Sequence, residues 1–176
     1  MVSRHMVGCV ERNQLAGNST GLGAGPKWAV PTVLYFAVAV TVHFTRYPQF
    51  VIRQLAWGTC IAIAAFLVLC GVTAYIGALL PLRKALREKR LLTSGLYSVV
   101  RHPLYASSIL LILPGVALLL RSWLLLPMPA VAYLAARAYI PAEEAQLRGR
   151  FGKAFDRYQS GTNAFFPRLW HRHKPG

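Results

Sequence analysis

Hydrophobic residues occur along the chain in four long runs that are separated by short polar segments. The runs cover residues 28–45, 55–80, 104–120 and 123–141. Each is close to the roughly 17–25 residues that a helix needs to cross a bilayer. Apart from His43 and Arg137, the runs carry no titratable or formally charged side chain of the Asp, Glu, His, Lys or Arg type. The pattern predicts an all-α integral membrane bundle of about four spans.

Proline interrupts the third and fourth runs. Pro114, followed by glycine, lies in the third, and Pro127 and Pro129 lie in the fourth. Only residues 121–122 separate the two runs, which predicts a tight antiparallel hairpin of helices. Bent helices are tolerated in a membrane where protein or a cavity satisfies the freed backbone groups. The prolines therefore indicate either lipid-adapted kinks or the wall of a cavity, and the sequence leaves both open.

The N-terminal residues have a different composition from the runs. Residues 1–27 contain Gly, Asn and Ser and are only mildly basic, and no clear small-residue cleavage site follows the first run. These features disfavour a signal peptide. We expect residues 1–27 to be disordered and residues 28–80 to form two transmembrane helices.

Basic residues dominate the polar segments, with 20 Lys and Arg against 5 Asp and Glu and a formal charge of +15. Such an excess can indicate nucleic-acid binding. Here the charges lie between and after apolar runs, which favours anionic lipid headgroups as partners and argues against nucleic acid. The three cysteines form no CxxC pair, so neither a disulfide framework nor a metal site is predicted.

The basic residues are also distributed unevenly among the segments. Segment 81–103 has six Lys or Arg and the part after residue 141 has seven, whereas segment 46–54 has two and the turn at 121–122 has one. Basic loops remain on the cytoplasmic side. With four spans, the chain is expected to be multi-pass with both termini and the 81–103 loop in the cytoplasm.

The first polar segment of chemical interest precedes the third run. Pro103 suits the first position of a helix, where its missing N–H costs nothing. Arg101 and His102 then lie at the mouth of that helix, where free N–H groups attract a carboxylate or phosphate. Arg101 alone is more typical of a basic flank that binds headgroups. His102 and Tyr105 are not needed to hold a span in place, so they favour a binding site.

The second segment follows the fourth run. Glu143 and Glu144 are adjacent just beyond Pro141, which is expected to start or kink a new helix. Acids in a first helical turn are stabilised by about 0.3–1 kcal/mol each, and Glu144 has i,i+4 spacing to Arg148. A well-capped interfacial helix therefore explains one glutamate better than it explains two.

This helix is expected to continue to about residue 158 as a C-terminal amphipathic cytoplasmic helix, because its apolar residues recur at helical spacing. Phe165 and Phe166 suit the membrane interface or the cover of a cavity. Since both polar segments are expected on one membrane face, their side chains are candidates for a single mixed-charge site with aromatic walls. Such a site suits a zwitterionic or cationic cofactor, and its members are Arg101, His102, Tyr105, Arg137, Tyr139, Glu143 and Glu144.

The two segments follow one another in an order that resembles a known family. The first reads Gly95-x-Tyr97-x-x-x-Arg101-His102-Pro103-x-Tyr105, and the second reads Glu143-Glu144-x-x-Leu147-x-x-x-Phe151-Gly152, with Tyr158 and Pro167 after it. With a helical hairpin between them, they resemble the isoprenylcysteine carboxyl methyltransferase family, which is related to the phospholipid methyltransferases. The resemblance covers about residues 80–170.

The resemblance implies a membrane-embedded methyltransferase that uses S-adenosylmethionine, with its catalytic region at 81–170 and a basic tail at 171–176. It implies an acceptor that is lipophilic or lipidated, either isoprenylcysteine carboxylate-like or a lipid. By analogy, the two acids face the positive groups of the cofactor, whose binding residues are Tyr97, Arg101, His102, Pro103, Tyr105, Glu143 and Glu144. The residues expected to take part in the reaction are Arg137, Arg101 and Glu144, with Arg137 or Arg101 orienting an acidic acceptor.

Two other functions remain open at this point. One is an NADPH-dependent membrane reductase similar to the sterol reductases, although a phosphate-rich cofactor would be repelled by the two acids. The other is a non-catalytic membrane protein that holds anionic lipid or a partner with its basic loops. Binding of the cofactors, measured separately, would discriminate among the three.

Overall fold

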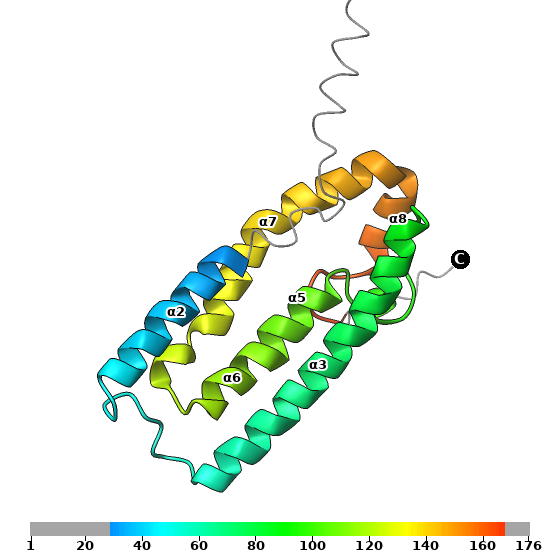
Figure 1. Ribbon diagram of the computed structural model, residues 1–176. Helices are drawn as coiled ribbons and strands as arrows, with labels where there is room; N and C mark the ends of the chain where they lie inside the picture. The colour runs from blue at the N-terminus through cyan, green and yellow to red at the C-terminus, as the bar shows by residue number, and fades with distance from the viewer. Residues whose placement is uncertain (1–28, 168–176) are drawn as a thin grey trace, which may run out of the picture.

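The computed structural model describes residues 29–167 and is built from helices (Figure 1). They are α2 (Ala29–Thr45), α3 (Trp57–Arg87), α4 (Leu96–Val99), α5 (Pro103–Ser107), the π-helix η1 (Ser108–Ile112), α6 (Leu113–Leu119), the 3-10 helix η2 (Trp123–Leu125), α7 (Met128–Phe151) and α8 (Lys153–Gly161). The described part contains isolated bridges but no β-strand. The all-α prediction is confirmed. The expected disordered segment 1–27 and basic tail 171–176 lie outside the described residues.

The long helices pack mainly in two pairs. α2 lies along α7, and the rod formed by α5, η1 and α6 lies along α3 (Figure 1). The last turns of α3 and α7, the start of α5 and the folded-back α8 gather at one end, which we call the polar end. The connections at 46–56 and 120–127 form the opposite end, which we call the hairpin end.

Two segments are long and apolar enough to cross a membrane, Trp57–Arg87 and Trp123–Phe151, and the apolar helices Ala29–Thr45 and Pro103–Leu119 are shorter. On α3, the side chains of Phe66 and Leu69 are 67% and 68% exposed. Apolar side chains exposed over a whole helix face are costly in water and suit contact with lipid. The model therefore supports membrane association, while the number of four spans stays a prediction.

α3 and the rod approach one another closely at two glycines. A Cβ atom at Gly115 would lie 2.7 Å from Cγ2 of Val68, and one at Gly71 would lie 2.7 Å from Cγ1 of Ile112. Only a residue without a side chain allows this separation, which is how helices commonly pack in membranes. The contact fixes the rod against α3.

The interruption predicted at Pro114 is confirmed. Pro114 has no N–H, and in a regular helix its ring would clash with the carbonyl of Leu110. The five residues Ser108–Ile112 form a wider π-helical turn, in which the Leu113 N–H bonds to the Ser108 carbonyl. π-helical turns of this kind occur within otherwise regular helices.

The fourth run is interrupted as well, between η2 and α7, but Pro127 and Pro129 lie at the start of a helix and do not kink one. Both prolines flank Met128, the first residue of α7, because the first turn of a helix has no use for their missing N–H groups. The hairpin is also wider than its predicted two-residue gap, since η2 lies between α6 and α7.

Helix boundaries at the polar end differ from the prediction as well. α3 continues to Arg87, so part of the expected loop is helical. α7 continues through Pro141 to Phe151, so Pro141 does not start a new helix. The expected amphipathic helix instead breaks at Gly152, whose φ of 53° is a backbone conformation that glycine adopts readily.

Candidate functional site

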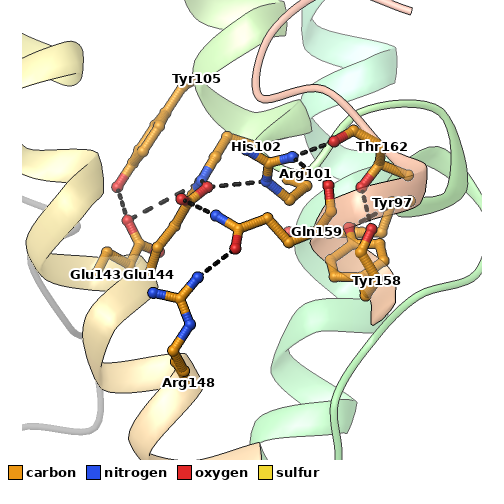
Figure 2. A network of polar contacts seen from close by, with 10 residues as sticks. All are labelled: Tyr97, Arg101, His102, Tyr105, Glu143, Glu144, Arg148, Tyr158, Gln159 and Thr162. Atoms are coloured by element: carbon orange, nitrogen blue, oxygen red, sulfur yellow. Dashed lines mark hydrogen bonds and ion pairs between the residues drawn. The ribbon is translucent and has the colours of Figure 1, made fainter. Parts of the chain in front are cut away.

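The polar end contains a connected network of hydrogen bonds and ion pairs (Figure 2). Its side chains come from the segment 97–105, from the last turns of α7, and from residues 152–167, which we call the C-terminal strap. The members are Tyr97, Arg101, His102, Tyr105, Glu143, Glu144, Arg148, Tyr158, Gln159 and Thr162.

Glu144 is the centre of this network. Its Oε1 accepts a 2.8 Å hydrogen bond from Arg101 Nε and lies 3.3 Å from His102 Nε2. Its Oε2 accepts a 2.8 Å hydrogen bond from Gln159 Nε2. Only 12% of the side chain is exposed. A carboxylate with charged and neutral donors on both oxygens is firmly held as an anion.

Glu143 is held less completely than its neighbour. Its Oε2 accepts a 2.8 Å hydrogen bond from the Tyr105 hydroxyl and lies 4.0 Å from His102 Nδ1. Its side chain is 26% exposed. Because fewer donors surround it, Glu143 retains more capacity than Glu144 to accept hydrogen bonds from a ligand.

The Arg101 side chain fastens the strap. Besides Glu144, it contacts two backbone carbonyls: Nη1 donates to Gln159 O at 3.1 Å and also to Thr162 O in a close contact. These carbonyls lie at the end of α8, where intrahelical donors run out. A guanidinium is well suited to this position because cations are stabilised at a helix C-terminus.

Backbone hydrogen bonds strengthen the same attachment. The Arg101 N–H donates to Asn163 O at 2.8 Å, and the His102 N–H donates to Ala164 O at 3.0 Å. The strap carbonyls therefore occupy the backbone N–H groups of the two residues just before the first turn of α5. Binding of an anion by the free N–H groups of that turn stays a prediction.

Aromatic rings line the network on the side of the rod. The His102 and Tyr105 rings are stacked, with centroids 5.3 Å apart and planes 4° apart. The ring centroid of Phe165 lies 6.5 Å from that of His102 and 5.2 Å from that of Tyr133. Phe165 is buried whereas Phe166 is exposed. The strap is thus anchored by one phenylalanine in the core as well as by hydrogen bonds.

Two tyrosines join the strap to α4. The Tyr158 hydroxyl donates a 2.7 Å hydrogen bond to the Tyr97 carbonyl. Burial raises the pKa of Tyr158 to about 12, and burial also raises the pKa of the Tyr97 hydroxyl. Both groups therefore remain protonated at neutral pH, and the Tyr158 donor is retained.

Six of the candidate residues predicted from sequence belong to this network: Tyr97, Arg101, His102, Tyr105, Glu143 and Glu144. Pro103 is buried at the first position of α5, and Tyr97 is buried at the edge of the network. Arg137 is exposed on α7 and Tyr139 is half-buried on the same helix. Within residues 29–167, neither of these two takes part in a hydrogen bond or ion pair with the network.

Sequence reasoning missed Gln159 and Thr162, which carry no motif. It also noted the i,i+4 spacing of Glu144 and Arg148, but these two side chains do not pair. Arg148 Nε bonds to Asp156 Oδ1 at 2.7 Å, and its Nη2 bonds to the amide oxygen of Gln159. The strap therefore determines which polar partners Arg148 receives.

The charges at the centre of the network have a net negative balance. Two carboxylates, Glu143 and Glu144, face one guanidinium, Arg101, so the balance is −1 when His102 is neutral. Such a site suits a ligand with net positive charge. In the part of the chain that the structure describes, no group of three or more His, Cys, Asp or Glu side chains is placed to hold a metal ion.

A comparison with family sequence models identifies the class of protein. The phospholipid methyltransferase family matches residues 52–154, more than half of the chain, including both polar segments. The bundle with this polar end is thus of the membrane methyltransferase class, whose activity is directed at lipid-like membrane substrates. In particular, the chain belongs to the phospholipid methyltransferase family. This confirms the resemblance to that group of families. A comparison with curated proteins found no match.

Proposed function

We propose that the protein transfers a methyl group from S-adenosylmethionine to a lipophilic acceptor in the membrane, either an isoprenylcysteine carboxylate-like group or a lipid. The supporting observation is that Glu143 and Glu144 meet Arg101, His102 and Tyr105 at one end of an apolar bundle. This arrangement places charge recognition at one end of an apolar bundle.

The residues present fit the cofactor chemically. S-adenosylmethionine carries a sulfonium, an ammonium and one carboxylate, a net charge opposite to the −1 balance of the site. Glu143 is suited to a positive group because it retains free acceptor capacity. The phosphates of NADPH would instead meet two carboxylates, which supports a methyltransferase over a reductase.

The residues have different parts in this proposal. When bound, S-adenosylmethionine supplies the methyl group. Glu144 and Arg101 hold the strap and the shape of the site. Arg137 is exposed and lies seven residues before Glu144, about two turns away on the same side of α7. Of the two candidate arginines, Arg137 is therefore the better placed to orient an acidic acceptor.

The chemistry of the acceptor sets what else the site must do. A carboxylate acceptor needs no base, whereas an amine acceptor must lose a proton. Glu143 is the acid suited to receive that proton because its contacts leave it partly exposed. We also propose that the polar end and both termini face the cytoplasm, as the excess of Lys and Arg at 81–103 and after residue 141 supports.

Calorimetric titration of the detergent-purified protein with S-adenosylmethionine, S-adenosylhomocysteine and NADPH tests the proposal. Saturable binding of the first two and not of NADPH is the expected result. Binding of NADPH alone would establish a reductase instead. If a folded protein bound none of the three, the non-catalytic function in lipid or partner binding would replace the proposal.

The substitution Glu143→Gln tests the placement of the cofactor. Loss of a charged hydrogen-bond acceptor is expected to weaken S-adenosylhomocysteine binding by about 10- to 100-fold, while thermal unfolding in detergent stays close to that of the wild type. Glu88→Gln is the matched control, because Glu88 pairs with Arg90 outside the network. Equal binding by the wild type and Glu143→Gln would refute this role for Glu143.

A further inference from the structure

The strap separates two opposite charges that the helical period places side by side. Glu144 and Arg148 are one turn apart on α7, a spacing at which a carboxylate and a guanidinium ordinarily pair. In the structure both polar side-chain contacts of Arg148 are instead with α8, to Asp156 and Gln159.

Gln159 stands between the two charges (Figure 2). Its amide oxygen accepts from Arg148 Nη2, and its amide nitrogen donates to Glu144 Oε2 at 2.8 Å. The chemistry permits only this orientation, because a guanidinium only donates and a carboxylate only accepts. Gln159 therefore bonds to both charges and fills the position in which they would meet.

Asp156 holds Arg148 from the other side. Its Oδ1 lies 2.7 Å from Arg148 Nε, and both side chains are 52% exposed. An ion pair this exposed contributes little to stability. The pair matters more for the orientation of the Arg148 side chain, since it supplies Arg148 with a carboxylate other than Glu144.

We infer that Asp156 and Gln159 are positioning residues that prevent Arg148 from neutralising Glu144. The inference rests on the proposed function, because it concerns the negative charge that a cationic cofactor meets. Pairing of Arg148 with Glu144 would bring a second positive charge to the central group of Glu143, Glu144 and Arg101 and change the balance of that group from −1 to zero. The match to the family ends at residue 154, so both positioning residues lie beyond the matched region.

The test compares single and double variants by titration with S-adenosylmethionine. Asp156→Asn releases Arg148 towards Glu144, and its Kd is expected to rise about five-fold. Arg148→Gln removes the competing charge and is expected to bind at least as tightly as the wild type. The double variant, Asp156→Asn with Arg148→Gln, is expected to recover wild-type affinity. Arg150→Gln is the control for removing a positive charge from the same end of α7 without touching the network.

A purely structural ion pair would give a different pattern. Both single variants would then lose affinity to the same degree, and the double variant would not recover, which would overturn the inference. The defect of Asp156→Asn should also shrink as salt is raised from about 0.05 to about 0.5 M, because the interaction is electrostatic. Thermal unfolding without ligand separates this effect from a folding defect.

The outcomes also separate this inference from the proposed function. If the wild type does not bind S-adenosylmethionine, the proposed function fails. If the wild type binds and Asp156→Asn binds equally well, only the inference about Arg148 fails.

Discussion

Each end of the bundle contains an arginine that fastens a chain segment through backbone carbonyls. At the polar end, Arg101 binds the carbonyls of Gln159 and Thr162. At the hairpin end, Arg121 Nη2 donates to the Ile52 carbonyl at 2.7 Å, and the Ile52 N–H returns a 2.7 Å bond to the Arg121 carbonyl. Arginine therefore has the same structural role at both ends of the bundle, where it holds a loop against the end of a helix.

The two ends differ in what surrounds the arginine. Arg101 also pairs with Glu144 at 2.8 Å, whereas no ion pair involves Arg121 among residues 29–167. Near the hairpin end, the buried His43 Nδ1 and Ser122 Oγ atoms have no hydrogen-bond partner in the part of the chain that the structure describes. An arginine bound to carbonyls is therefore a structural feature by itself, and the acid pair is what distinguishes the candidate site.

The largest expected effect comes from removing the charge at the polar end. Arg101→Met leaves the carboxylate of Glu144 without its guanidinium and releases the carbonyls of the strap. Breaking a largely buried pair in this way is expected to lower the free energy of unfolding by about 3–5 kcal/mol. Unfolding of the variant in mixed detergent measures this loss. A variant as stable as the wild type would show that the strap does not depend on Arg101.

Arg121→Met at the hairpin end is the matched substitution, and its effect is expected to be smaller. It removes hydrogen bonds to the Ile52 carbonyl but leaves no unpaired carboxylate, so the expected loss is about 1–3 kcal/mol. S-adenosylhomocysteine binding, measured by titration of the folded variant, should be unchanged. Weaker binding would show that the hairpin end also contributes to the candidate site, contrary to this expectation.

The smallest expected effect is that of Tyr158→Phe, which removes one hydrogen bond between the strap and α4 at a cost of about 1 kcal/mol. The pKa of Tyr158 is raised from about 10 to about 12 by burial. Its contribution is therefore complete below pH 10 and is lost as the pH rises from 10 towards 12. The free energy of unfolding, measured from pH 10 to pH 12, should fall less steeply for Tyr158→Phe than for the wild type. Equal slopes for the two proteins would refute the role of Tyr158.

The sequence predicted the parts of the fold that depend on local pattern. Four apolar runs gave the long helices, and Pro103 and Pro114 marked a helix start and an interruption correctly. Pro127 and Pro129 mark the start of α7 and not a bend within a helix. The sequence does not show this difference, because a proline inside an apolar run has the same appearance at the start of a helix as in its middle. Gly152 gave no clear signal, since its positive φ depends on the chain folding back.

For the candidate site, the sequence predicted the residues that a motif brings together, including Arg101, Glu143 and Glu144. It could not predict the strap. Gln159 acts through an amide that only tertiary contact places between Glu144 and Arg148. Helical spacing predicted the wrong partner for Arg148 because Asp156 competes from another helix, and spacing along one helix contains no information about that competitor.

The π-helical turn of the rod has a consequence for how the protein tolerates change. Such a turn is equivalent to one inserted residue, which rotates everything beyond it by about 100° relative to a regular helix. Before it, Tyr105 belongs to the core shared with α7 and the strap. After it, Gly115 meets α3. The two halves of the rod therefore have separate angular phases, so that evolution can repack one half without turning Tyr105 away from Glu143.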